Sequence, residues 1–322
     1  MSKAAKDGNG PGADETDRVR DVERILKDEL ARSDRALHGV PSVLTHLLAS
    51  AGHSLVSDAI VARLRGMHSS LAVQLLNAKS GTSGGSPDSR DIDRLADHLA
   101  GDSVVLSYCY ALAMEGHLAE RLEQRCSLDP ILSPLLQELI ASPDAATGEL
   151  GMGALAAQSR FIQSQRRMEL PLAELPAELF HAVLKRWEVH ERGDPELASA
   201  IKALKARYDE GASRVGLLAR LVSSMRGGAI AALELEHAGL ALFVAALSTL
   251  GKQPRELAIL ACHEQQAARL ALSLRAAGLE QAAIERQFLL LEPTERLPGD
   301  IGEISPKRAA ALLKNASSQD QG

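Results

Sequence analysis

Apolar side chains recur every three or four positions along most of the chain, with polar side chains between them. This is the period of an α-helix that buries one face, and no β-hairpin signal interrupts it. The pattern therefore predicts an all-α protein. The predicted helices, in chain order, cover 17–36, 41–51, 54–65, 68–78, 91–100, 102–115, 117–126, 130–141, 143–168, 176–191, 195–209, 212–226, 229–250 with a break at Gly239, 254–261, 264–277 and 280–291.

Helix start and stop signals support these boundaries. A capping residue followed by proline, which suits a first helical turn, occurs at 129–130, 142–143 and 194–195. Short links between short antiparallel helices indicate one of two architectures, an irregular HEAT-like solenoid or a multi-helix bundle. The helices come in loosely spaced pairs, which favours the solenoid, and the bundle stays open.

Polar and glycine-rich stretches divide the chain into five segments. We expect a disordered tail at 1–16, an N-terminal helical part at 17–78, and a flexible Gly/Ser loop at 79–91. A main helical domain at 92–292 follows. The last segment, 293–322, contains three prolines and is predicted to be mostly disordered, with one short helix from Pro306 to Asn315.

Composition narrows the function. Aromatic residues make up only 2% of the 322 residues, whereas Leu and Ala supply about a third, which disfavours sheets. The net charge of −6 and the few aromatic rings argue against nucleic-acid binding. The longest apolar run, 238–247, is too short to span a membrane, and three scattered cysteines form no disulfide framework. A cytoplasmic protein fits these features.

Enzymatic motifs fail when their full pattern is required. His263-Glu264 begins a zinc-protease motif but lacks the second histidine. Glu234 and His237 share a helix face, as in helical di-metal sites, but a second copy of the pattern is missing. We therefore expect no catalytic residues, no metal site and no cofactor.

The predicted helix at 143–168 carries the most informative pattern. Gln158 and Gln165 lie within its apolar stripe and are expected to form a structural polar pair that bonds to a neighbouring helix. Arg160, Gln163 and Arg167 gather on another face, which is either solvated or a clamp for an anion or a partner's carboxylate.

The run ELPLAELPAELF follows this helix. Its two Leu-Pro steps predict a rigid extended elbow beside the arginine face, and Glu174 lies in it. The alternative is an ordinary, well-built corner. The candidate partner-binding residues are therefore Arg160, Gln163, Arg167 and Glu174.

Two stretches of the chain resemble a known family. AAQSRFIQSQRRMELPLAELPAELFHAVL (156–184) and QPRELAILACHEQQAARLALSLRAAGLEQAAIERQFLLLEP (253–293) are similar to the helical bacterial family called domain of unknown function 2336, found mainly in alphaproteobacteria. The similarity covers most of 40–293. It implies an all-helical protein with no assigned reaction, and it supplies no catalytic residues.

Two functions remain after these exclusions. The first is a non-enzymatic cytoplasmic adaptor or regulatory protein that binds another protein on an extended surface; a homo-oligomer is compatible with it. The alternative is a helical small-ligand sensor or enzyme with an inter-helix pocket, for which Arg160, Arg167, Glu174, His181 and Glu234 are the candidate polar groups. A deep pocket lined by several of these residues favours the sensor, and a broad shallow groove favours the adaptor.

Overall fold

The computed structural model describes residues 11–49, 58–80, 87–263, 266–291 and 300–319, and every regular element in them is a helix. The all-α prediction is therefore confirmed. The chain divides into two compact units, a larger one of Leu37–Leu260 and a smaller one of Met1–Ala36 with Ala261–Gly322. This division differs from the predicted one, because 17–36 groups with the end of the chain and not with 37–78.

The larger unit contains most of the helices. They are the end of α1 (Pro11–Ala49), α2 (Asp58–Ser80), α3 (Ser89–Ala100), α4 (Ser103–Cys126), α5 (Pro134–Ile140), α6 (Ala145–Arg167), η1 (Leu172–Glu174), α7 (Ala177–His190), α8 (Leu197–Arg207), η2 (Glu210–Ala212), α9 (Arg214–Ser224), η3 (Arg226–Leu233), α10 (Leu235–Gly251) and α11 (Arg255–Ala261).

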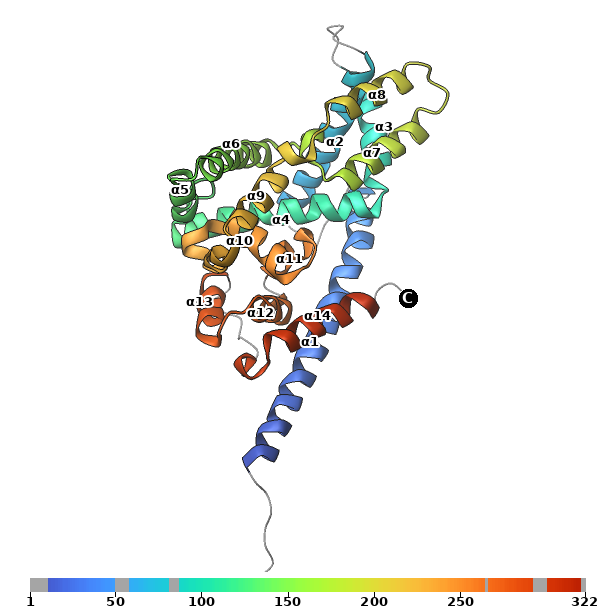
Figure 1. The fold of residues 1–322 in the computed structure, drawn as a ribbon. Helices are drawn as coiled ribbons and strands as arrows, with labels where there is room; N and C mark the ends of the chain where they lie inside the picture. Colours follow the sequence, from blue (N-terminus) through green and yellow to red (C-terminus); the bar gives the residue numbers. More distant parts are fainter. Residues whose placement is uncertain (1–10, 50–57, 81–86, 264–265, 292–299, 320–322) are drawn as a thin grey trace, which may run out of the picture. The chain divides into compact units, whose positions relative to one another are not determined.

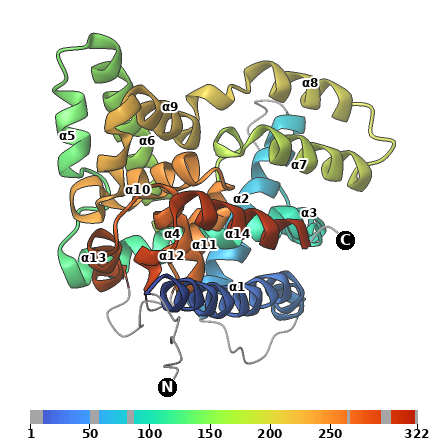
Figure 2. The same ribbon diagram turned by 60° about the horizontal axis from the view of Figure 1, so that its bottom comes forward.

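Helix α4 connects two groups of helices in this unit. It packs against α2, α3 and α7 toward one end and against α6 toward the other (Figure 1 and Figure 2). Helices α5, α6, α9 and α10 form the second group through their mutual contacts. More than half of the residues of α4 are buried, which is expected for a helix surrounded by others.

The smaller unit is formed by the first part of α1 with α12 (Ala267–Ala276), α13 (Gln281–Leu291), η5 (Ile301–Glu303) and α14 (Pro306–Gln319). Helix α12 packs against α13 and α14, and ion pairs join Arg269 to Asp34 and Arg308 to Glu23. The 300–319 part of the predicted C-terminal tail is therefore folded. Its apolar residues at 309, 312 and 313 have helical spacing, and this face is buried.

Two glycines predicted to separate helices lie inside continuous ones. Helix α2 runs through Gly66 and α4 through Gly116, where pairs of shorter helices were predicted. A Cβ at position 66 would lie 2.5 Å from Cβ of Met168, and one at position 116 would lie 3.0 Å from Oε1 of Gln165. Both glycines therefore permit close approach of α6 and the residue that follows it. Helix α1 also continues through Pro41, since proline removes one backbone donor without always ending a helix.

The predicted break at Gly239 is confirmed. Its backbone has φ 67° and ψ 164°, which is not helical, and it lies within the range of α10. A side chain there would also meet Ser133, whose Cβ would lie 2.9 Å away. Of the predicted loop at 79–91, residues 79–80 end α2 and 89–91 begin α3, whereas 81–86 lie outside the described residues.

A search for membrane-spanning segments found no single helix in the described ranges that is long and apolar enough. Helices α9 and η3 pass the length and composition test only as a pair, and the pair is bent by 118°.

Candidate ligand cavity

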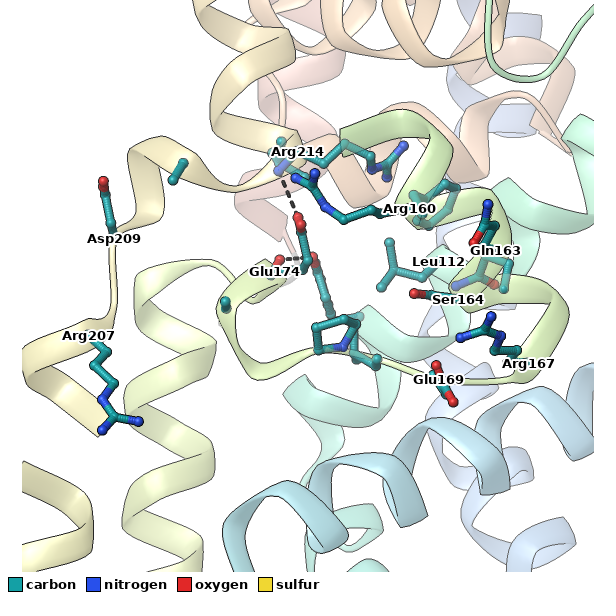
Figure 3. A pocket seen from close by; sticks show the side chains of 18 residues that line it. Leu112, Arg160, Gln163, Ser164, Arg167, Glu169, Glu174, Arg207, Asp209 and Arg214 are labelled. Carbon is teal, nitrogen blue, oxygen red and sulfur yellow. Dashed lines mark hydrogen bonds between the residues drawn. The ribbon is translucent and has the colours of Figure 1, made fainter. Parts of the chain in front are cut away.

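A cavity of about 470 Å³ lies in the larger unit beside the C-terminal half of α6 (Figure 3). Residues of α4, the segment after α6, the end of α8, the region of η2 and the start of α9 also line it. All four predicted partner-binding residues line it: Arg160, Gln163, Arg167 and Glu174. Of the other pocket candidates, His181 and Glu234 do not line it.

Helix α6 ends in a way that fixes this wall. Asp144 caps its start, and Met168 ends it in the left-handed conformation with φ 59°. The N–H of Glu169 donates to the carbonyl of Ser164 at 2.8 Å, a bond typical of this helix ending. The chain then turns through Pro171 into the elbow, which we define as residues 169–175.

Two side chains of α2 form hydrogen bonds with the backbone of the elbow. Gln74 Nε2 donates to the carbonyl of Leu170 at 2.8 Å, and its Oε1 accepts from the N–H of Leu172 at 2.9 Å. The N–H of Leu170 also donates to Ser70 Oγ at 3.2 Å. Two side chains of α2 therefore bind the backbone of this extended segment. These bonds restrain the elbow, for which the Leu-Pro pattern predicts a rigid conformation.

Glu174 connects the elbow to α9. Its Oε2 accepts from the N–H of Arg214 at 2.7 Å, at the first residue of α9, where backbone donors lack helical partners. Its carbonyl accepts from the Tyr108 hydroxyl at 3.3 Å. Glu174 therefore lines the cavity as predicted, but its carboxylate already has a structural partner.

A buried ionic network borders the cavity, and we define it as Glu115, Gln158, Arg214 and Arg255. Nη1 and Nη2 of Arg214 donate to the two carboxylate oxygens of Glu115 at 2.8 and 2.7 Å, a bidentate pair. Nη2 of Arg255 donates to Glu115 at 2.8 Å, and Gln158 Oε1 accepts from Arg214 at 3.0 Å. The guanidinium of Arg214 also lies 3.6 Å from the centre of the Phe161 ring.

The network contains more cationic than anionic side chains. Burial alone would raise the pKa of Glu115, but Arg214 and Arg255 outweigh it and lower that pKa to about 2. One carboxylate thus faces two guanidinium groups. Within the described residues, the buried Nε of Arg255 has no hydrogen-bond partner. Glu174, which accepts from the N–H of Arg214, is the second carboxylate that acts on the Arg214 guanidinium.

Two further arginines stand at the mouth of the cavity, and we call Arg160 and Arg167 the arginine rim. Both are exposed, as is Gln163 between them. Within the described part of the chain, no hydrogen bond or ion pair engages either guanidinium. Figure 3 shows both side chains reaching toward the hollow from α6, whereas Arg207 and Asp209 lie apart, near the end of α8. The rim can therefore donate to an incoming anion.

The rest of the wall is mainly apolar. Leu112, Phe161, Leu170, Pro171 and Val215 line the cavity. Carbon surface beside a few donors is typical of sites that bind a small molecule by its apolar body and orient it by its charged group.

The two predicted polar residues of α6 are both buried. Gln158 donates from Nε2 to the carbonyl of Pro130 at 2.7 Å and accepts from Arg214, so it joins α6 to the loop before α5 and to α9. Gln165 lines the cavity and lies against Gly116 of α4.

Sequence reasoning predicted Gln158 but missed the three charged residues of the buried network. A signal for Glu115 was present, because it is the lone charge within the apolar run ALAMEGHLA of α4. Arg214 and Arg255 follow capping positions at the starts of helices and look like ordinary surface residues. Their convergence depends on packing that no local pattern reveals. His237 pairs with Glu138 at 3.0 Å, and no group of three or more metal-ligating side chains occurs in the described part of the chain.

No protein-family model, curated protein or solved structure significantly matches the chain. The assignment of a function therefore depends on the geometry of this cavity.

Proposed function

We propose that the chain is a non-enzymatic binding module whose cavity takes a ligand with one anionic group and an apolar body. The observation that carries this proposal is the arginine rim: two exposed guanidinium groups without a partner among the described residues stand over an apolar cavity of about 470 Å³. That volume falls within the range of about 300–1,000 Å³ typical of small-ligand pockets.

The charge distribution supports an anion. The cavity is lined by four arginines, Arg160, Arg167, Arg207 and Arg214, and by three carboxylates, Glu169, Glu174 and Asp209. The carboxylate of Glu174 is already engaged by α9. A carboxylate at the rim would receive charge-assisted hydrogen bonds, which are stronger than neutral ones. Burial of its apolar part against Leu112 and Val215 would add to the affinity.

The elbow gives such a module a means of reporting the ligand. The same short segment lines the cavity and is bound by Ser70 and Gln74 of α2. A ligand that shifts the elbow would therefore change its hydrogen bonds to α2, and the change would reach that helix.

The adaptor function remains the second candidate. Because Arg160, Gln163 and Arg167 are exposed, an acidic side chain of a partner protein can reach them from solvent. The cavity would then receive an anchor residue of that partner. Co-purification of a partner with the wild-type chain, but not with the Arg160→Ala/Arg167→Ala variant, would favour this function.

Octanoate, octylammonium and 1-octanol test the ligand proposal, because they share an alkyl body and differ in charge. We expect octanoate to raise the melting temperature in a concentration-dependent way, since a ligand of the native state stabilises it. The other two should have a much smaller effect. Equal shifts with octanoate and octylammonium, or no shift with octanoate, would contradict the proposal.

A further inference from the structure

A second hollow of about 410 Å³ lies in the larger unit, bordered by α2, the elbow, α7 and the end of α8. Two residues, Ala173 of the elbow and Arg207 of α8, line both this hollow and the main cavity. The two spaces therefore share part of their walls. Ala173 is exposed and carries only a methyl group, so the barrier between the two hollows is low at this position.

The second hollow differs from the first in its chemistry. Leu172, Leu204 and Tyr208 provide carbon surface, and none of the described residues that line it is a carboxylate. The ring of Tyr208 stacks on Phe180 with centroids 4.0 Å apart, and its hydroxyl donates to the carbonyl of Leu175 at 2.7 Å. The ring is therefore fixed in place.

The amide of Gln74, which also lines the second hollow, is bonded to the elbow backbone. Of the described residues, Asn77 and the shared Arg207 offer further polar side chains there. The two arginines of the rim line the first hollow alone. The rim supplies two arginines and the second hollow only the shared Arg207 among the described residues, so an anionic group is better placed at the rim and an apolar arm beyond Ala173.

We propose that the two hollows form one elongated site for a long-chain monocarboxylate. The proposal rests on the proposed function and specifies its ligand class. The carboxylate binds Arg160 and Arg167, and the alkyl chain crosses Ala173 beneath Arg207 to lie against Leu204 and Tyr208. A flexible unbranched chain fits two moderate hollows joined at a narrow ridge better than a single bulky body does.

Calorimetric titration with octanoate, decanoate, dodecanoate and tetradecanoate, each below its critical micelle concentration, tests this site. In the wild type, each addition of two methylenes should lower the dissociation constant about 15-fold, because each buried methylene contributes about a fourfold gain. Ala173→Trp should block the ridge and abolish the gain from octanoate to tetradecanoate.

A second variant and a control make the result specific. Leu204→Asp places a carboxylate in the second hollow and should likewise remove the gain with chain length, whereas Ala198→Trp, on an exposed position of α8 outside both hollows, should behave as the wild type. Melting curves establish that the variants are folded.

The outcomes separate the two proposals. If octanoate fails to bind the wild type, the proposed function is wrong. If octanoate binds and longer chains bind no more tightly, or if both ridge and hollow variants retain the full gain, the ligand is confined to the first hollow and the elongated site is wrong.

Discussion

The buried network and the arginine rim lie at the same cavity and use the same cation, yet they differ in burial and pairing. Arg214 is buried, bonded twice to Glu115 and packed on Phe161. Arg160 and Arg167 are exposed and have no partner in the described part of the chain. An arginine engaged on every side contributes to the fold, whereas one that is free to donate is available to a ligand.

This contrast predicts opposite consequences of mutation. Changes in the network should alter stability, because they leave a charge buried without compensation. Changes in the rim should alter binding, because an exposed side chain without a partner adds little to stability.

The largest expected effect is that of Glu115→Gln. This substitution leaves Arg214 and Arg255 buried without their carboxylate, and we expect a loss of about 3–5 kcal/mol in the free energy of unfolding. Urea denaturation followed by the fluorescence of Trp187, the single tryptophan, reports on the larger unit.

Glu120→Gln provides the matched control on the same helix. Glu120 also pairs with an arginine, Arg63, but its side chain is 43% exposed. We expect its loss to cost at most about 1 kcal/mol. Equal effects of the two substitutions would show that the Glu115 network does not stabilise the fold in the way we describe.

The stability of the larger unit should also depend on pH through Glu115. Because the folded state lowers its pKa from the ordinary 4.5 to about 2, its contribution is complete above about pH 4.5 and is lost as the pH falls toward 2. The loss should be on the order of 3 kcal/mol. Comparison of wild type with Glu115→Gln separates it from other carboxylates: the stability difference between them should shrink in this range, and a constant difference would contradict an ionised Glu115.

A smaller change in stability is expected from a substitution at Gly66, where α2 contacts Met168 at the end of α6. Gly66→Ala should destabilise the protein by about 1–3 kcal/mol, because the new methyl would overlap Met168. At Gly39, also within a helix, an added Cβ would meet no atom of the described residues within 4 Å, so Gly39→Ala should instead stabilise by about 0.5–1 kcal/mol. Thermal melting of both variants gives the signs, and stabilisation by Gly66→Ala would refute the close contact.

The helical class and the residues of the rim could be predicted because both depend on local pattern. The spacing of apolar side chains gives the helical period, and Arg160, Gln163 and Arg167 share a face of one helix whatever surrounds it. The elbow was also visible, because proline restricts its own backbone and that of the residue before it.

What escaped prediction depends on contacts between distant segments. Gly66 and Gly116 look like helix breaks in sequence, and only the position of the end of α6 shows that they make room for it. Arg255 lies 140 residues from Glu115, and no periodicity links them. The fold of the C-terminal segment was underestimated because its polar flanks mask a short apolar face that is buried in the smaller unit.

The most direct test of the account is the affinity and stability of the Arg160→Ala/Arg167→Ala variant, measured by octanoate titration and thermal melting. A control variant, Arg125→Ala/Arg166→Ala, removes the same charge at exposed positions that do not line the cavity. We expect the rim variant to bind octanoate at least tenfold more weakly, since one lost charge-assisted bond contributes about 1.5–3 kcal/mol, with each substitution changing stability by no more than about 0.5 kcal/mol. A rim variant that loses stability and keeps full binding would show that this face is structural and that the site is wrongly assigned.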